Sequence, residues 1–176
     1  MRIPFLSPVR PLNVPFVGGM IALVALNVGV DRISKWIALA NLEGRGAVSV
    51  VGDYFVLVLA RNQGAFLSAG ASLPPTLRWL FLSGLPTLAL LFAVIWLLLH
   101  PEIRRSVAIS TACIIGGGVS NIFDRLFNDG RVVDFMNFGI GSLRTGILNV
   151  ADLSITFGAI ALFWFSRKDS ENAPPQ

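Results

Sequence analysis

Four stretches of apolar residues, each long enough to cross a bilayer, constrain this chain more than any other feature of its sequence. A helix needs about 20 residues to span roughly 30 Å of hydrocarbon. Runs of that length occur at about 16–39, 77–99, 107–127 and 147–165. Only 14% of the residues are charged and 54% are hydrophobic, against about 25% charged in soluble domains. The sequence therefore predicts a mainly α integral membrane protein with four transmembrane helices, and it excludes nucleic-acid binding as the main task.

Basic residues predict the orientation of these helices, because Lys and Arg favour the cytoplasmic side. One side of the predicted bundle carries six of them in short segments: Arg2, Arg10, Arg104, Arg105, Arg167 and Lys168. The other side carries five, spread over longer loops: Arg45, Arg61, Arg78, Arg131 and Arg144. The greater density predicts that both termini are cytoplasmic.

The two outer loops are expected to have some structure of their own. Residues 47–51 and 54–60 form β-rich runs joined by a Gly-Asp turn. They are too apolar for a free hairpin in water, so we expect a β-rich extracytoplasmic platform at 40–62 on the membrane surface. The glycine-rich segment 128–146 predicts a short helix or a capping loop. We expect one domain over 1–166 and a disordered cytoplasmic tail over 167–176.

Several charged residues lie in or beside the apolar spans, where each costs a few kcal/mol on insertion scales. The predicted topology brings all of them to about one depth near the outer face: Asp31, Lys35, Asp124, Arg125, Asp134 and Asp152. This convergence marks the most informative region of the sequence.

Two Asn-x-x-Asp pairs, Asn121 with Asp124 and Asn149 with Asp152, sharpen that prediction. Residues three apart share a helix face. If both faces point into the bundle, the two carboxylates meet and share one proton. Such a pair activates water and donates a proton to a scissile carbonyl in aspartic proteases. The spacing thus predicts Asp124 and Asp152 as a catalytic pair.

Structural interpretations stay open beside the catalytic one. Asp124 could form an ion pair with Arg125 at a helix end, and Asp152 could cap a neighbouring span. Asp31 and Lys35, four apart, could form a salt bridge, and Asp134 could bind a backbone amide. A proton-coupled transporter is a further alternative, because intramembrane acids also serve proton relays. With one histidine, one cysteine and no HExxH, no metal site is expected.

Five motifs in order support a family assignment. They are Asp31-x-x-x-Lys35, Arg61-Asn62-Gln63-Gly64-Ala65-Phe66, Gly116-Gly117 to Asn121 with Asp124-Arg125, Val133-Asp134-Phe135, and Asn149-x-Ala151-Asp152. Over nearly its whole length the chain resembles the bacterial lipoprotein signal peptidases, also called signal peptidase II.

The resemblance implies an aspartic endopeptidase of the bacterial inner membrane with its site near the periplasmic face. Such an enzyme removes signal peptides from diacylglyceryl-modified prolipoproteins by cleaving before the lipidated cysteine. By motif position, Asp124 and Asp152 are implied to be catalytic. Substrate-binding or supporting roles are implied for Asp31, Lys35, Asn62, Gly64, Asn121, Arg125, Asp134, Asn149 and Ala151. The resemblance further implies no cofactor, contact with membrane lipid, a monomer, and inhibition by globomycin.

Three positions depart from the family pattern. Ser120 stands where glycine is usual, Leu148 replaces a phenylalanine, and the segment after Asn62 reads GAFLS in place of GAAFS. No acid is lost, so activity is expected. The departures keep open a divergent relative with altered substrate range or inhibitor sensitivity, and a divergent relative without peptidase activity is the alternative.

Overall fold

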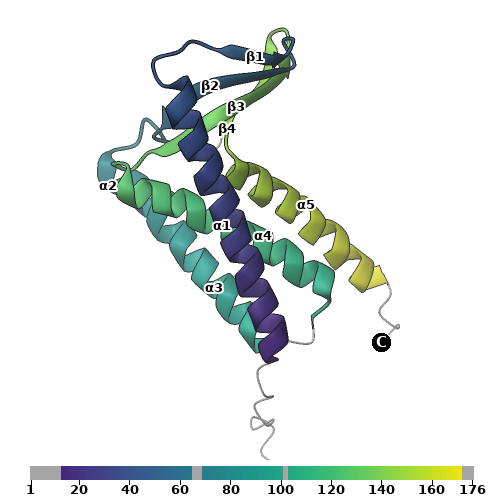
Figure 1. Ribbon diagram of the computed structural model, residues 1–176. Coiled ribbons are helices and arrows are strands. Elements are labelled where there is room, and N and C mark those ends of the chain that lie inside the picture. Colours follow the sequence, from purple (N-terminus) through teal and green to yellow (C-terminus); the bar gives the residue numbers. More distant parts are fainter. Residues whose placement is uncertain (1–12, 65–68, 101–102, 172–176) are drawn as a thin grey trace, which may run out of the picture.

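The computed structural model describes residues 13–64, 69–100 and 103–171. A bundle of long helices carries a four-stranded antiparallel sheet at one end, here called the sheet end (Figure 1). The elements are α1 (Val14–Leu42), β1 (Val48–Val51), β2 (Phe55–Asn62), α2 (Pro75–Trp79), η2 (Leu80–Gly84), α3 (Leu85–Leu99), α4 (Arg105–Phe127), β3 (Val132–Ile140), β4 (Leu143–Leu148) and α5 (Val150–Glu171). Helix α1 begins, and helix α5 finishes, at the end of the bundle opposite the sheet.

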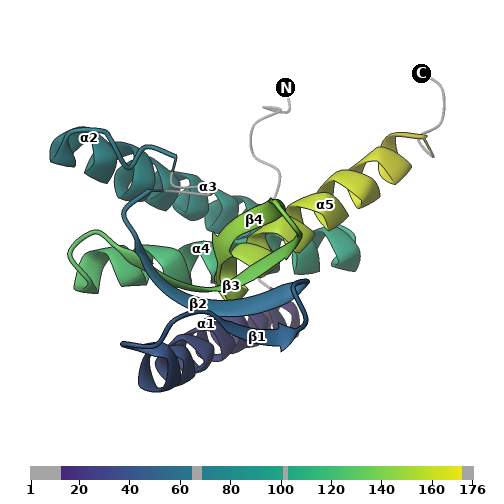
Figure 2. The ribbon, with the colours of Figure 1, turned by 90° about the horizontal axis from the view of Figure 1, so that it is seen from above.

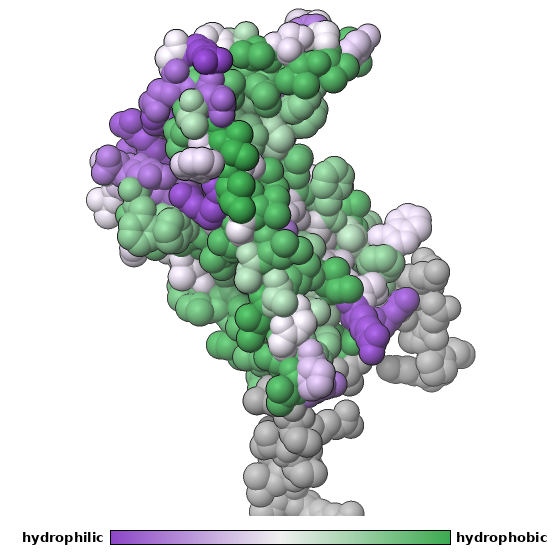
Figure 3. Space-filling view, in the orientation of Figure 1, coloured by the Kyte–Doolittle hydropathy of each residue, from purple (hydrophilic) through white to green (hydrophobic). Residues whose placement is uncertain are grey.

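Four segments are long and apolar enough to cross a membrane, which confirms the predicted spans. The second span consists of α2, η2 and α3 in succession. Its middle part, η2, is a π-helical turn, and Pro86 follows in the first turn of α3. Proline has no N–H to donate to the preceding turn, and π-bulges in helices often occur at functional sites. The apolar residues that the helices expose cover the bundle in the space-filling view (Figure 3).

Helix α4 is the centre of the bundle and packs against α1, α3 and α5. Small residues along it permit close approach of the neighbouring backbones. A Cβ atom at Gly116 would lie 2.6 Å from Asn27 Cβ on α1, and one at Gly117 would lie 2.5 Å from the Ala151 carbonyl oxygen on α5. The three consecutive glycines therefore serve close helix packing.

The sheet has the order β1-β2-β3-β4, and every neighbouring pair is antiparallel. Seen from above, it lies across the end of the bundle over α1 and α4 (Figure 2). Phe55 on β2 stacks on Phe138 of β3, with ring centroids 4.7 Å apart. A cluster with Ala38, Leu42, Phe135 and Met136 at its centre joins α1 to β3. The sheet is thereby fixed to the helices beneath it.

The structure confirms the two β-rich runs and corrects two other expectations. The segment 128–146 forms β3 and most of β4 rather than a short helix or a loop, and residues 147 and 148 also belong to β4. β3 is buried on both faces at its start, so its sequence lacks the alternation that marks a half-exposed strand. Residues 167–171 continue α5, whereas 172–176 of the predicted tail lie outside the described residues.

Candidate functional site

Asn149 and Asp152 form the start of α5. The Asn149 side-chain oxygen accepts from the Asp152 backbone N–H at 2.9 Å, and the Asp152 carboxylate accepts from the Asn149 backbone N–H at 3.1 Å. This reciprocal arrangement is a capping box, which satisfies two backbone donors that a helix start leaves free. Asp152 thereby lies in the first turn of α5. The cap fixes Asp152 at the junction between β4 and α5.

Asp134 lies on β3, opposite Ala60 of β2, and is 2% exposed. Its two carboxylate oxygens accept from two amide groups, from Asn149 Nδ2 at 2.7 Å and from Asn62 Nδ2 at 3.0 Å. The Asn62 oxygen in turn accepts from the Gly64 backbone N–H at 2.8 Å, which fixes the direction of this amide. Asp134 therefore accepts side-chain amide hydrogens where the sequence left open a backbone amide.

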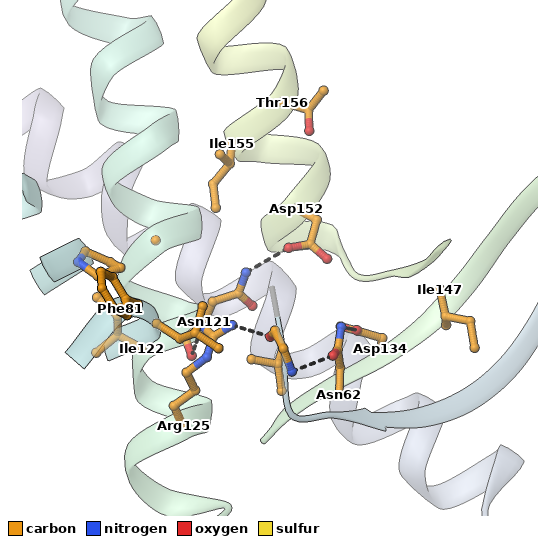
Figure 4. Close-up of a pocket in the computed structure, with 15 residues that line it drawn as sticks. Asn62, Phe81, Asn121, Ile122, Arg125, Asp134, Ile147, Asp152, Ile155 and Thr156 are labelled. Atoms are coloured by element: carbon orange, nitrogen blue, oxygen red, sulfur yellow. Dashed lines mark hydrogen bonds between the residues drawn. The ribbon is translucent and has the colours of Figure 1, made fainter. Parts of the chain in front are cut away.

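Asn121 on α4 connects this group with Asp152. Its Nδ2 donates to Asp152 at 2.8 Å, while its oxygen accepts from Asn149 Nδ2 at 3.2 Å (Figure 4 shows the Asn121–Asp152 bond). Asn149 thus donates to both Asn121 and Asp134. The two asparagines form a continuous chain of hydrogen bonds between the Asp134 and Asp152 carboxylates.

Both carboxylates line one cavity of about 530 Å³, called here the main cavity. Its other lining residues are mostly apolar and come from the second, third and fourth spans and from the sheet: Phe81, Leu82, Pro86, Gly118, Ile122, Val132, Ile147, Ile155, with Asn62, Gly64, Asn121, Arg125 and Thr156. In Figure 4 Asn62, Asn121, Asp134 and Asp152 lie together in it. Arg125 donates to the Gly64 carbonyl at 2.9 Å and so attaches the end of the β2 loop to α4.

The surroundings of Asp134 change its acidity. Burial raises its pKa from 3.8 to about 6, and the charge of Asp152 contributes in the same direction. The amide donors Asn62 and Asn149 oppose that shift, because they stabilise the ionised carboxylate. The Asp134 carboxyl group can therefore hold a proton in weakly acidic solution.

A second group of charged side chains, called here the ion cluster, consists of the acids Asp31 and Asp124 and the bases Arg32 and Lys35. The ammonium of Lys35, 1% exposed, lies 2.6 Å from Asp31 and 2.8 Å from Asp124, both 0% exposed. Asp124 also forms a salt bridge with Arg32 and accepts from the Val133 backbone N–H at 3.1 Å. The predicted salt bridge between Asp31 and Lys35 is present, and it extends to Asp124.

Asp31 also connects α1 to the start of α5. It accepts from the Ala151 backbone N–H at 2.8 Å and from the Ser120 hydroxyl at 2.6 Å. Ser120 is a departure from the family pattern, and its hydroxyl gives the buried Asp31 carboxylate one more donor. Lys35 reaches the first group of acids as well, since it donates to the Asn121 side-chain oxygen at 3.2 Å.

The structure does not bring Asp124 and Asp152 together in the main cavity. Asp124 is not among the described residues that line that cavity, and its oxygens accept from Lys35, Arg32, Asn128 and Val133. Asp134 lies in the position expected for Asp124. Among the described residues, the two carboxylates that line this cavity are those of Asp134 and Asp152.

The charges of the first span carried a signal for the ion pairs of Asp124. Arg32 and Lys35 lie three residues apart there, and the single carboxylate of Asp31 cannot balance two positive charges. Arg32 was missed as a partner of Asp124, and so were the apolar lining residues of the second span. Ala65 and Phe66 of the predicted motif lie outside the described residues. In the part of the chain that the structure describes, no three His, Cys, Asp or Glu side chains are arranged to hold a metal ion.

A family comparison decides what kind of enzyme contains this cavity. The model of the family described as signal peptidase (SPase) II matches residues 23–168, which include every residue of the main cavity and the ion cluster. The chain belongs to the signal peptidase II family. Membership identifies it as a bacterial membrane protein and an aspartic endopeptidase, and it decides against the transporter alternative.

Individual relatives agree with this family. A lipoprotein signal peptidase of Borrelia hermsii is 33% identical over 150 residues, covering 82% of this chain and 86% of that protein. One of Ralstonia nicotianae is 35% identical over 146 residues, covering 83% and 82%. A solved bacterial membrane enzyme has the same fold, with a TM-score of 0.75 and 23% identity over 92% of this chain and 94% of that one.

Proposed function

We propose that Asp134 and Asp152 are the catalytic pair with which this signal peptidase II member removes signal peptides from prolipoproteins. The observation that carries the proposal is the contrast in surroundings. Both carboxylates line the main cavity and, among the described residues, accept from N–H groups of amides and backbone, whereas Asp124 is neutralised by Lys35 and Arg32. A carboxylate that is already paired with two cations is a poor base. A hydrogen-bonded pair facing a cavity can share one proton and act on water.

Peptide hydrolysis by this pair proceeds in two steps. In the first, the ionised carboxylate takes a proton from water, the water oxygen bonds to the scissile carbonyl carbon, and the protonated carboxyl gives its proton to the carbonyl oxygen. In the second, the C–N bond breaks as the leaving nitrogen takes the proton that came from water. The hydroxyl proton of the intermediate returns to the other carboxylate. The products are a new carboxyl terminus and a free amine, and the pair again holds one proton.

The shape of the main cavity supports a lipid-modified substrate. Phe81, Leu82 and Pro86 from the second span line it together with Ile122 from α4 and Ile155 from α5. Apolar walls between membrane-spanning helices suit acyl chains and an apolar signal peptide that enter sideways from the bilayer. We therefore assign as substrate a diacylglyceryl-modified prolipoprotein, cleaved before its lipidated cysteine, and we expect globomycin to compete for the same cavity.

Charge at the end of the bundle opposite the sheet supports the predicted orientation. Arg104 immediately precedes α4, Arg105 is its first residue, and Arg167 lies near the end of α5. With these residues in the cytoplasm, a monomer in the bacterial inner membrane would hold its sheet and catalytic pair near the periplasmic face. Labelling of Arg45→Cys by a membrane-impermeant reagent, in a Cys113→Ser background, tests this orientation; labelling from the cytoplasm only would reverse it.

The decisive experiment compares three aspartate variants in cleavage of a purified diacylglyceryl prolipoprotein. Asp134→Asn and Asp152→Asn are each expected to reduce kcat by at least about 10⁴-fold, as loss of a catalytic group does. Each substitution places an NH2 group where a carboxylate oxygen accepted an N–H, so a small fall in unfolding temperature is expected, and kcat is compared on the folded fraction. Asp124→Asn should lower the unfolding temperature while the folded fraction still cleaves.

Asp53→Asn is the matched control, since Asp53 is exposed and pairs with Arg144 on the sheet away from the main cavity. It should cleave like the wild type. Cleavage by Asp134→Asn at a rate near that of the wild type would reject the proposed pair. A folded but inactive Asp124→Asn protein, with Asp134→Asn active, would restore the pairing of Asp124 with Asp152.

A further inference from the structure

A second cavity of about 310 Å³, called here the side cavity, adjoins the main cavity at Asp134. Its lining residues come from β2, β3, β4 and the segment before α2: Ala60, Arg61, Asn62, Gln63, Ala71, Asp134, Gly146 and Ile147. Asn62, Asp134 and Ile147 line both cavities. The hydrogen-bonded Asn62–Asp134 pair therefore forms part of the wall between them.

The two cavities differ in the elements that enclose them. Helical residues such as Phe81, Ile122 and Ile155 dominate the main cavity. No residue of the helices lines the side cavity among the described residues, which places it within the sheet layer, beyond the bundle. Besides Asn62 and Asp134, its wall contains the polar side chains of Arg61 and Gln63 and the small residues Ala60, Ala71 and Gly146. One cavity thus adjoins the membrane spans, and the other adjoins the water-facing layer.

A peptide cut at Asp134 must extend to both sides of that residue. Its two halves differ strongly in a lipoprotein precursor: the signal peptide and the lipid are apolar, and the chain that follows the lipidated cysteine enters water. We propose that the side cavity binds the first residues that follow this cysteine, while the signal peptide and lipid occupy the main cavity. This assignment rests on the proposed function, and it makes the side cavity a specificity subsite of the same reaction.

The small residues of the side cavity give this subsite a predicted preference. Ala71 contributes a single methyl group to its wall, so a larger side chain there would occupy space that a substrate side chain uses. Pockets discriminate by about ten-fold or more for small changes in volume. The side cavity should therefore limit the size of the residues that follow the cysteine, and Ala71 should set part of that limit.

The test uses two diacylglyceryl prolipoproteins that differ only in the two residues after the cysteine, Gly-Gly in one and Phe-Phe in the other. Ala71→Phe is expected to lower kcat/KM at least about ten-fold for the Phe-Phe substrate and less than about two-fold for Gly-Gly. Ser72→Phe is the matched control, because Ser72 is exposed and lies outside the side-cavity wall. It should lower neither value.

A second substrate pair, changed only in residues before the cleaved bond, fixes the direction of the peptide. Ala71→Phe should affect its two members equally. An equal loss on all four substrates, or discrimination only by the residues before the bond, would overturn the assignment. Ala71→Leu serves the same comparison with a smaller side chain should the phenylalanine variant not fold. If the wild type cleaves and Asp134→Asn does not, a failure of these tests rejects the side-cavity assignment alone.

Discussion

Two groups of carboxylates lie on either side of Asn121, and they differ in the groups that contact them. In the ion cluster, Lys35 contacts both Asp31 and Asp124, and Arg32 completes the balance of charge. In the main cavity, the described contacts of Asp134 and Asp152 are amide and backbone N–H groups, with no salt bridge. Burial of an acid is thus not a sign of catalysis by itself. The informative property is a buried acid that lacks a cation and faces a cavity.

The largest effect on the free energy of unfolding should come from removing the ammonium group of Lys35 from the ion cluster. Lys35→Met leaves the buried carboxylates of Asp31 and Asp124 facing each other, and losing one partner of a buried ion pair costs about 3–5 kcal/mol. We expect a correspondingly lower free energy of unfolding, measured by denaturant unfolding in detergent micelles. The double variant Asp31→Asn with Lys35→Met should recover part of it, because Asp124 keeps Arg32.

Arg61→Gln is the matched control for that measurement. Arg61 pairs with Glu43 at the surface, where both side chains are about half exposed, and exposed pairs contribute about 0–1 kcal/mol. A Lys35→Met protein as stable as Arg61→Gln would show that the ion cluster is not a structural unit.

These two groups also show what sequence patterns could and could not predict. The four spans follow from run length, and the depth of the acids follows from the spans. The pairing does not, because Asn121-x-x-Asp124 and Asn149-x-x-Asp152 share a spacing but not a geometry. The first lies within α4, where Asp124 meets the cations of α1, while the second is a capping box at a helix start. Asp134 lies in a strand that a glycine-rich pattern concealed, and tertiary contacts alone bring it to Asp152.

The pH dependence of cleavage should come from the carboxylates of Asp134 and Asp152 in the main cavity and not from the ion cluster. With the pKa of Asp134 at about 6, the shared proton is present below that pH and is lost as the pH rises through it. We expect kcat/KM to fall on the alkaline side from about pH 6. Asn62 stabilises the ionised form of Asp134 and so lowers its pKa. Asn62→Leu should therefore move the alkaline limb to higher pH.

The position of the alkaline limb can be measured even if Asn62→Leu also lowers kcat/KM at every pH. A loss by the same factor at every pH cancels when the values of kcat/KM at two pH values are divided. Asn137→Ala is the control, because Asn137 lies on β3 like Asp134 but donates to the Thr145 carbonyl. This variant should leave the alkaline limb in place. A limb that stays fixed or moves to lower pH in Asn62→Leu would assign the essential proton to another group.

The smallest effects are expected from alanine substitutions at Gly116 and Gly117, two neighbouring glycines of α4. Each substitution disturbs one of the two groups of carboxylates. An added Cβ at Gly116 would meet Asn27 on α1, the helix of the ion cluster, whereas one at Gly117 would meet the carbonyl of Ala151, one residue before Asp152. Overpacking of this kind costs about 1–3 kcal/mol, so both alanine variants should unfold at lower denaturant concentration. Gly19→Ala on α1, where nothing lies within 4 Å of the added Cβ, should be neutral or slightly stabilising.

Only Gly117→Ala should also reduce kcat of the folded protein, because a displacement of about 1 Å at a reacting group can lower a rate about 10²-fold. Gly116→Ala moves α1 against the ion cluster, whose hydrogen bonds with Asn121, Ala151 and Val133 involve neighbours of the catalytic pair rather than its two carboxylates. Its folded fraction should therefore cleave at close to the wild-type rate. Equal losses of kcat in the two variants would mean that the ion cluster and the catalytic pair move as one unit, with the hydrogen bonds of Asn121, Ala151 and Val133 as the rigid connection between them.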